Sequence, residues 1–274
     1  MHNAYVSFEQ FLVVKCGLQP ITIHGYMGTV RRARNVIGEN PKHEDVINYI
    51  HVMYASTFSY SYKTNTALAL EKWMEYLGNP LKLGRQKKPK RIIKDTLSEG
   101  EITKILFNCK NIREKTILSF LAYSGLRNKE LCDFKVKDID FASNSLRVLN
   151  GKGLKDSLCY ISRDCIKTLI EYLASCPRGY DSYLFTTLRH GHRYNERDLR
   201  KLLNTVSKRA KITKRVYPHL LRHSLATNLL LRGANLLTVK GQLRHAWVTT
   251  TEIYIHSLEY ATRNDYEQHA PSYN

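Results

Sequence analysis

Acidic residues are scarce in this chain of 274 residues. Asp and Glu number 24 against 43 Lys and Arg, which gives a formal net charge of +19 at pH 7. A surplus of this size indicates a polyanionic partner, and nucleic acid is the first candidate. A basic surface kept for solubility ranks second. An anionic membrane surface ranks third, because no strongly amphipathic terminal helix is evident.

Long apolar runs and paired cysteines are also missing. No stretch approaches the ~18–20 uninterrupted apolar residues of a membrane span, and no signal-peptide pattern opens the chain. The six cysteines form no C-x-x-C pair and no His/Cys spacing typical of zinc. We therefore expect reduced thiols in a cytoplasmic protein without membrane contact. No carboxylate cluster suits a two-metal site, so no metal or other cofactor is expected.

Helical periodicity dominates residues 1–84, which we expect to form a four-helix domain. Glycine and proline mark the helix ends: Gly17 stops the first, Pro20 and Gly38 bracket the second, and Gly78 follows the fourth. The apolar stripe of the fourth helix is typical of a core rather than of a ligand surface.

A basic segment follows, and we expect residues 85–92 to link two domains. Residues 85–91 hold five cations, one proline and no apolar residue. One interpretation is a linker that lies along DNA phosphates. The alternative is a linker that is merely solvated. The candidate DNA contacts are Arg85, Lys87, Lys88, Lys90 and Arg91.

Residues 93–274 predict a mostly helical domain with a small antiparallel sheet. Ser98 and Glu101 have the spacing of a capping box at the start of a helix. Alternation over 145–149 and 157–161, with a polar glycine-containing stretch between, predicts a β-hairpin. Further helices are expected near residues 164, 196, 218, 235 and 250. The predicted fold is therefore mainly α, in two domains.

Several side chains in the second domain are suited to phosphate chemistry. His219 and Arg222 are three apart on a helix that Pro218 can start, so both lie on one face and can reach one phosphate. Arg127 follows Gly125 at the start of a short helix, where a guanidinium can bind a phosphate bidentately. A single H-x-x-R on a helix is common and usually has no functional meaning, and a lone arginine in G-L-R is usually a surface residue. The longer string H-x-L-R-H-S-x-A-T is much less expected by chance.

A lysine, a second histidine and a tyrosine complete the set. Lys152 lies in the hairpin turn, where an ammonium can protonate a leaving oxygen; Lys155 is its rival. His245 can donate to a phosphate oxygen, although a histidine beside Trp247 can equally be a packed core residue. Tyr254 is one of 18 tyrosines and needs positive surroundings to act as a nucleophile.

In this order and spacing the six residues resemble the tyrosine recombinases, also called the lambda-integrase family. The resemblance covers the chain from about residue 93 and favours the compact Xer-like or archaeal type. Residues 1–84 resemble the family's core-binding domain more weakly. The family fold implies two domains that form a clamp around duplex DNA.

The resemblance also implies a role for each residue. Tyr254 would attack the scissile phosphate to give a 3′-phosphotyrosine. Arg127, Arg222 and His245 would hold the phosphate, Lys152 would protonate the leaving 5′-oxygen, and His219 would be the acid–base partner of the tyrosine. A homotetramer on synapsed DNA sites would exchange strands through a Holliday junction. Whether the free protein is a monomer stays open.

One departure and two alternatives accompany this resemblance. Arg244 stands where the family usually has glycine, before the second histidine, and we expect it to contact DNA. A type IB topoisomerase shares much of the catalytic set, and a catalytically silent DNA-binding relative is also conceivable. The small N-terminal domain and the intact set favour a recombinase for integration, excision or dimer resolution.

Overall fold

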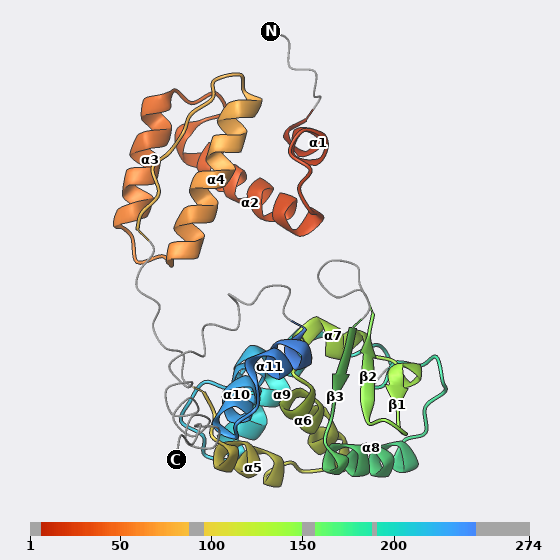
Figure 1. Ribbon diagram of the computed structural model, residues 1–274. Coiled ribbons are helices and arrows are strands. Elements are labelled where there is room, and N and C mark those ends of the chain that lie inside the picture. The colour runs from red at the N-terminus through yellow and green to blue at the C-terminus, as the bar shows by residue number, and fades with distance from the viewer. Residues whose placement is uncertain (1–6, 88–95, 150–156, 188–190, 245–274) are drawn as a thin grey trace, which may run out of the picture. The chain divides into compact units, whose positions relative to one another are not determined.

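The computed structural model describes residues 7–87, 96–149, 157–187 and 191–244. The chain divides into two compact units, Met1–Ile92 and Ile93–Asn274, and each is described by itself. Within the described residues, the first unit is helical and the second combines helices with a three-stranded antiparallel sheet (Figure 1). The predicted mainly helical fold, with its small sheet in the second part of the chain, is confirmed.

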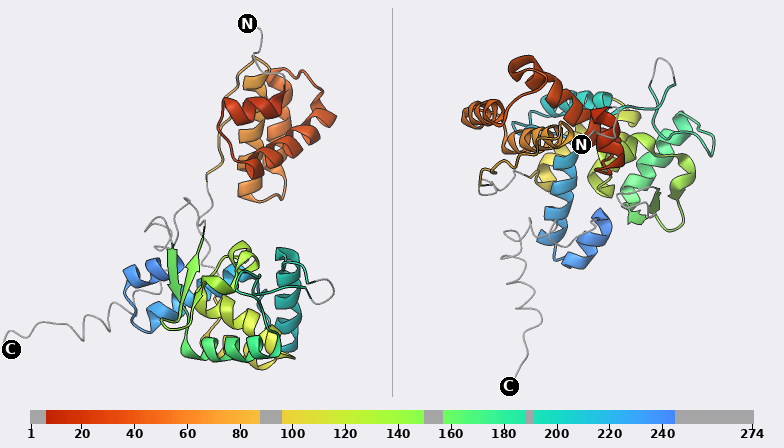
Figure 2. Two further views of the ribbon diagram at one scale, coloured as in Figure 1. Left: turned by 90° about the vertical axis from the view of Figure 1, so that its right-hand side faces the viewer. Right: turned by 90° about the horizontal axis from the view of Figure 1, so that it is seen from above.

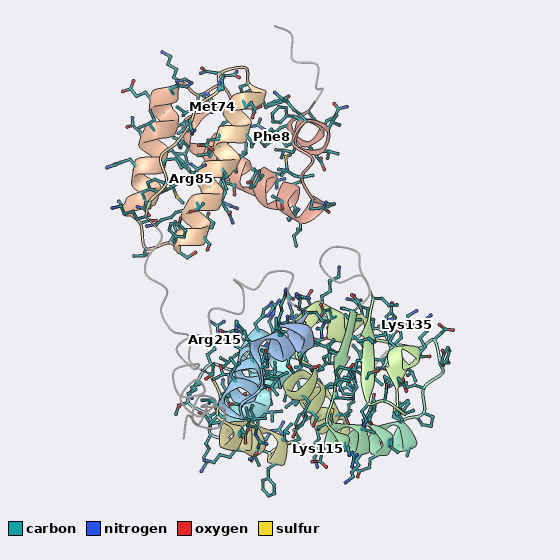
Figure 3. The ribbon with its side chains drawn as sticks, in the orientation of Figure 1. Phe8, Met74, Arg85, Lys115, Lys135 and Arg215 are labelled. Atoms are coloured by element: carbon teal, nitrogen blue, oxygen red, sulfur yellow. The ribbon has the colours of Figure 1, made fainter. Side chains whose placement is uncertain are left out.

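Four helices make up the described part of the first unit, and local signals fix their ends. Ser7 caps the first helix through the N–H of Gln10, and Pro20 occupies the first turn of the second. Gly38 ends that helix at φ 79°. Phe8 and Met74, labelled in Figure 3, belong to the shared core. The helices are α1 (Phe8–Val14), α2 (Pro20–Ile37), α3 (His43–Ala55) and α4 (Tyr60–Tyr76).

The chain after α4 packs back onto the first unit instead of leaving it directly. Leu83 is buried, and its N–H donates to the Glu71 carboxylate at 2.6 Å. The Arg85 guanidinium (Figure 3) donates to both oxygens of the same carboxylate, from Nη2 at 2.6 Å and from Nη1 at 3.1 Å. The Tyr54 hydroxyl donates to the carbonyl of Gly84 at 2.7 Å. The start of the basic segment is therefore held against α3 and α4.

The second unit is built around α6 (Ile112–Ser124), which packs against α8 and α10. Eight of its 13 residues are buried, so α6 is a core helix that exposes only a narrow face to solvent. The predicted capping box of Ser98 and Glu101 begins α5, with reciprocal bonds of 3.2 and 2.8 Å. The other elements are α5 (Glu99–Phe107), α7 (Asn128–Asp133), η1 (Val136–Asp138), α8 (Arg163–Ser175), α9 (Glu196–Arg209), α10 (Pro218–Leu231) and α11 (Leu236–Leu243).

The sheet has the order β1-β2-β3, with both pairs antiparallel. The predicted hairpin is confirmed as β2 (Ser145–Val148) and β3 (Ser157–Tyr160), with Leu146 opposite Cys159. The two-residue strand β1 (Ile139–Asp140) was not predicted, because two residues are too short to show alternation. Strand β3 contacts α6 and α11, and Figures 1 and 2 show the sheet beside these helices.

Candidate active site

Arg127 is placed by the junction between α6 and α7. Gly125 ends α6 in the left-handed conformation at φ 64°, and Arg127 is the N-cap residue of α7. The Arg127 N–H donates to Glu130 Oε2 at 2.7 Å, and its Nη1 donates to Oε1 of the same carboxylate at 2.5 Å. The side chain remains 29% exposed. The guanidinium is therefore oriented by protein and still open to a ligand.

Arg222 reaches the same junction from α10. Pro218 begins this helix as predicted, so His219 and Arg222 lie one turn apart within it. His219 is exposed, whereas Arg222 is buried with 4% exposure. The Arg222 guanidinium donates to the carbonyls of Gly125 and Leu243. These bonds join the end of α6 to the end of α11 through one buried cation.

Arg244 follows α11 in the left-handed conformation, at φ 54° and ψ 45°. That backbone geometry is the one that glycine adopts most readily. The Arg244 side chain is only 5% exposed and pairs with Glu130 at 2.7 Å. It also donates to the carbonyl of Gln242 at 3.1 Å. In this structure Arg244 contacts protein rather than an outer surface, and its DNA contact stays a prediction.

Glu130 is a site residue that the sequence analysis did not single out. Burial would raise the pKa of its carboxyl, but the charge of Arg244 and the hydrogen bonds and charge of Arg127 lower that pKa below its ordinary value. The carboxylate therefore stays ionised at neutral pH. The available signal was the spacing R-x-x-E, in which the glutamate accepts from the N–H of the residue that precedes α7, as in one half of a capping box.

Gln242 ties the end of α11 to the hairpin. Its Oε1 accepts from the N–H of Tyr160 at 3.0 Å, and its Nε2 donates to the carbonyl of Tyr160 at 2.7 Å. The same amide donates to the carbonyls of Tyr123 and Ser124 at the end of α6, each at 3.3 Å. Strand β3, the end of α6 and the end of α11 are thus joined by one side chain.

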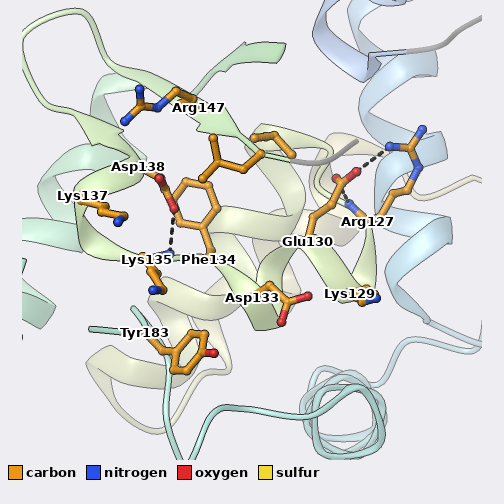
Figure 4. A pocket seen from close by; sticks show the side chains of 12 residues that line it. Arg127, Lys129, Glu130, Asp133, Phe134, Lys135, Lys137, Asp138, Arg147 and Tyr183 are labelled. Carbon is orange, nitrogen blue, oxygen red and sulfur yellow. Dashed lines mark hydrogen bonds and ion pairs between the residues drawn. The ribbon is translucent and has the colours of Figure 1, made fainter. Parts of the chain in front are cut away.

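A cavity of about 540 Å³ opens beside Arg127 (Figure 4). Figure 4 shows the Glu130 carboxylate turned toward Arg127 at one side of this cavity. Besides Arg127, two of its cations are engaged: Lys137 pairs with Asp181 at 2.7 Å, and Lys135 lies over the Tyr183 ring at 5.7 Å. The wall holds five cationic side chains, from Arg127, Lys129, Lys135, Lys137 and Arg147, and three carboxylates, from Glu130, Asp133 and Asp138. Cations outnumber carboxylates in this wall, which favours a polyanion as ligand.

The other predicted site residues divide into two groups. Seven of them lie outside the described residues: Lys88, Lys90, Arg91, Lys152, Lys155, His245 and Tyr254. Lys87 is exposed, and Arg85 pairs with Glu71 as described above. Of the predicted set, the structure therefore brings together Arg127, Arg222 and Arg244, from three separate segments of the chain.

The cysteines take no part in this site. All six are free thiols. Burial raises the pKa of Cys132 and Cys165 to about 12 and that of Cys159 to about 11, so these thiols stay protonated. In the part of the chain that the structure describes, no group of three or more His, Cys, Asp or Glu could hold a metal ion. No helix in that part is both long and apolar enough to cross a membrane.

Comparison with known proteins gives consistent matches. Residues 95–260 match the Phage integrase family. A tyrosine recombinase of Pseudothermotoga lettingae is 30% identical over 94% of this chain and 95% of that protein. The crystal structure of XerA recombinase has 29% identity and a TM-score of 0.58, and the match covers 97% of each chain. A structure of the XerH site-specific recombinase bound to palindromic difH substrate has 21% identity and a TM-score of 0.71, covering 97% of this chain and 85% of that one.

Proposed function

The chain belongs to the phage integrase family of tyrosine recombinases, and on this basis we propose how its residues act. The protein is a tyrosine site-specific recombinase that cleaves and rejoins DNA. We assign catalytic roles to Arg127, Lys152, His219, Arg222, His245 and Tyr254.

One observation supports the assignment most directly: Arg127 and Arg222 converge on the turn at Gly125. Arg222 donates to the Gly125 carbonyl, and Arg127 follows two residues later with a partly exposed side chain. The two residues are 95 positions apart in the chain, so only the packing of α10 on α6 brings them together. Two guanidiniums around one point can neutralise the charge that develops on the nonbridging oxygens of a phosphate. Loss of one such donor typically costs about 3–4 kcal/mol of transition-state stabilisation.

The proposed reaction conserves the energy of the phosphodiester. The Tyr254 oxygen bonds to the scissile phosphorus, and the bond from phosphorus to the 5′-oxygen breaks. His219 takes the phenolic proton, and Lys152 gives a proton to the leaving 5′-oxygen. His245 donates to a nonbridging oxygen beside the two arginines. Attack by a 5′-hydroxyl on the 3′-phosphotyrosine reverses these steps and reseals the strand.

Double-stranded DNA is the proposed partner. The net charge of +19 and the cationic cavity beside Arg127 support it, as does the DNA-bound structure of the related XerH. We assign DNA binding to residues 1–84, a linking role to residues 85–92 and catalysis to residues 93–274. Four protomers on two synapsed sites would complete the exchange of strands.

A suicide substrate, in which a nick lets the cleaved end diffuse away, tests the assignment. We expect the wild-type protein to form a covalent complex through the 3′-phosphate. Tyr254→Phe should bind the same DNA with unchanged affinity and form no adduct, because the attacking oxygen is gone. Tyr260→Phe is the matched control and should retain the adduct. An adduct that persists in Tyr254→Phe would place the nucleophile elsewhere.

A further inference from the structure

The Glu130 carboxylate lies between two guanidiniums. Its Oε1 accepts from Arg127 Nη1 at 2.5 Å, and its Oε2 accepts from Arg244 Nη2 at 2.7 Å and from the Arg127 N–H at 2.7 Å. The carboxylate side chain is 12% exposed. Both oxygens are therefore satisfied by protein, and water contributes little to their solvation.

The Arg244 side chain is buried and makes several hydrogen bonds with protein, unlike a typical surface cation. It is 5% exposed, and its donors reach Glu130, the carbonyl of Gln242 and, at 3.5 Å, the carbonyl of Gly125. The Gly125 carbonyl is also an acceptor for Arg222. Arg244 thus contacts an anchoring group of each arginine that we assign to the phosphate. In this arrangement its side chain contacts protein.

A buried carboxylate with one guanidinium partner would hold that partner strongly. Breaking such a pair leaves a buried charge without compensation, which is costly. A phosphate that approaches Arg127 must compete with Glu130 for the same guanidinium. A second cation on Glu130 lowers the cost of this competition, because the carboxylate keeps a partner when Arg127 turns to the ligand.

We propose that Arg244 is a positioning residue of the active site, which neutralises Glu130 and so leaves the Arg127 guanidinium available to the scissile phosphate. The inference rests on the phosphate-binding role proposed for Arg127. Among the described residues, the N–H groups of Arg127 other than its backbone N–H and Nη1 make no hydrogen bond. They remain as donors for a ligand, while Nη1 and the backbone N–H hold the side chain to Glu130.

A double-mutant cycle tests this inference. The rate of covalent-complex formation on the suicide substrate is measured under single-turnover conditions for wild type, Arg244→Leu, Glu130→Gln and the double variant. Leucine keeps a non-glycine side chain at the left-handed position but removes the charge. We expect Arg244→Leu to slow cleavage by about 10–100-fold, the range of coupling between residues in contact.

The double variant is the decisive measurement. Glutamine at position 130 leaves no negative charge to neutralise. In that background Arg244→Leu should therefore slow covalent-complex formation by no more than about 3-fold. A role for Arg244 that is independent of Glu130 would instead make the two losses multiply. Arg232→Leu is the matched control: it removes a cation paired with Glu99 at 2.5 Å elsewhere in the same unit, and it should keep the wild-type rate.

Two results would overturn the inference: a wild-type rate in Arg244→Leu, or a double variant slowed by the full product of the single losses. Unfolding midpoints of all variants show that rates are measured on folded protein. Failure of the proposed function itself would look different, because wild type would then form no adduct or Tyr254→Phe would still form one.

Discussion

At the scale of single residues, the site depends on a glycine. Gly125 adopts φ 64°, and its carbonyl accepts hydrogen bonds from Arg222 and Arg244. A Cβ at this position would lie 2.7 Å from Leu243 Cδ2 and 3.1 Å from Leu225 Cδ2. Both the backbone conformation and the close approach of the Leu243 and Leu225 side chains therefore favour glycine.

Substitution of this glycine should be costly. We expect Gly125→Ala to lower the free energy of unfolding by about 2–4 kcal/mol, from left-handed strain and overpacking together. Gly241→Ala is the matched control: it is exposed within α11, has no heavy atom within 4 Å of the added Cβ, and should gain about 0.5–1 kcal/mol. Urea unfolding of the two variants measures the difference. Equal effects in both would contradict the role given to Gly125.

At the scale of elements, ion pairs join segments of the second unit that are distant in the chain. Glu114 at the start of α6 accepts two bonds from Arg209 at the end of α9, at 3.0 and 3.2 Å. Glu101 in α5 accepts from Lys214 at 2.8 Å. The hydrogen bond from Lys214 lowers the pKa of the Glu101 carboxyl. Burial raises the pKa of Glu114, but the bonds from Arg209 and Lys110 outweigh burial and bring it below the ordinary 4.5.

These shifts predict a loss of stability in acid. A carboxyl whose pKa is lower in the folded state binds protons first in the unfolded chain. Its stabilisation is present above the unfolded pKa and disappears as the pH falls through the folded pKa. We expect the urea midpoint to fall between about pH 6 and pH 3. Glu114→Gln should be less stable at neutral pH and show a smaller fall, and an unchanged pH profile would contradict the contribution of this pair.

At the scale of the whole molecule, we expect the net positive charge to dominate the affinity for DNA. With +19 formal charges on 274 residues, many phosphate contacts and much counterion release are expected on binding. The cations lie in both units, at Arg85 and Lys87 in the first and around the cavity beside Arg127 in the second.

Affinity for DNA should therefore fall steeply with salt. For about six to ten phosphate contacts, raising salt from about 50 to 200 mM should weaken binding by about 10³–10⁵-fold. Replacing Lys87, Lys88 and Lys90 by glutamine should reduce the slope of log affinity against log salt by about one for each lysine that contacts a phosphate. Binding titrations at several salt concentrations measure the slope. An unchanged slope would mean that the linker is only solvated.

Much of the local structure could be read from the chain. Pro20, Gly38 and the pair Ser98–Glu101 mark helix ends where the structure has them, because a cap depends on residues only three or four apart. The hairpin was also predictable from local sequence, because the alternation of its two strands and the polar stretch between them lie within a short segment. The roles assigned to Lys152, His219, His245 and Tyr254 come from order and spacing, and they stay predictions.

The sequence by itself determined the helical fold, the hairpin, the family and the presence of arginines suited to phosphate. The tertiary structure alone decided that Arg244 is buried on Glu130, that Arg222 binds the Gly125 carbonyl and that Arg85 pairs with Glu71. The first contact joins residues 114 positions apart and the second joins residues 97 apart. Such contacts depend on how α6, α7, α10 and α11 pack, and no pattern within a few residues encodes that packing.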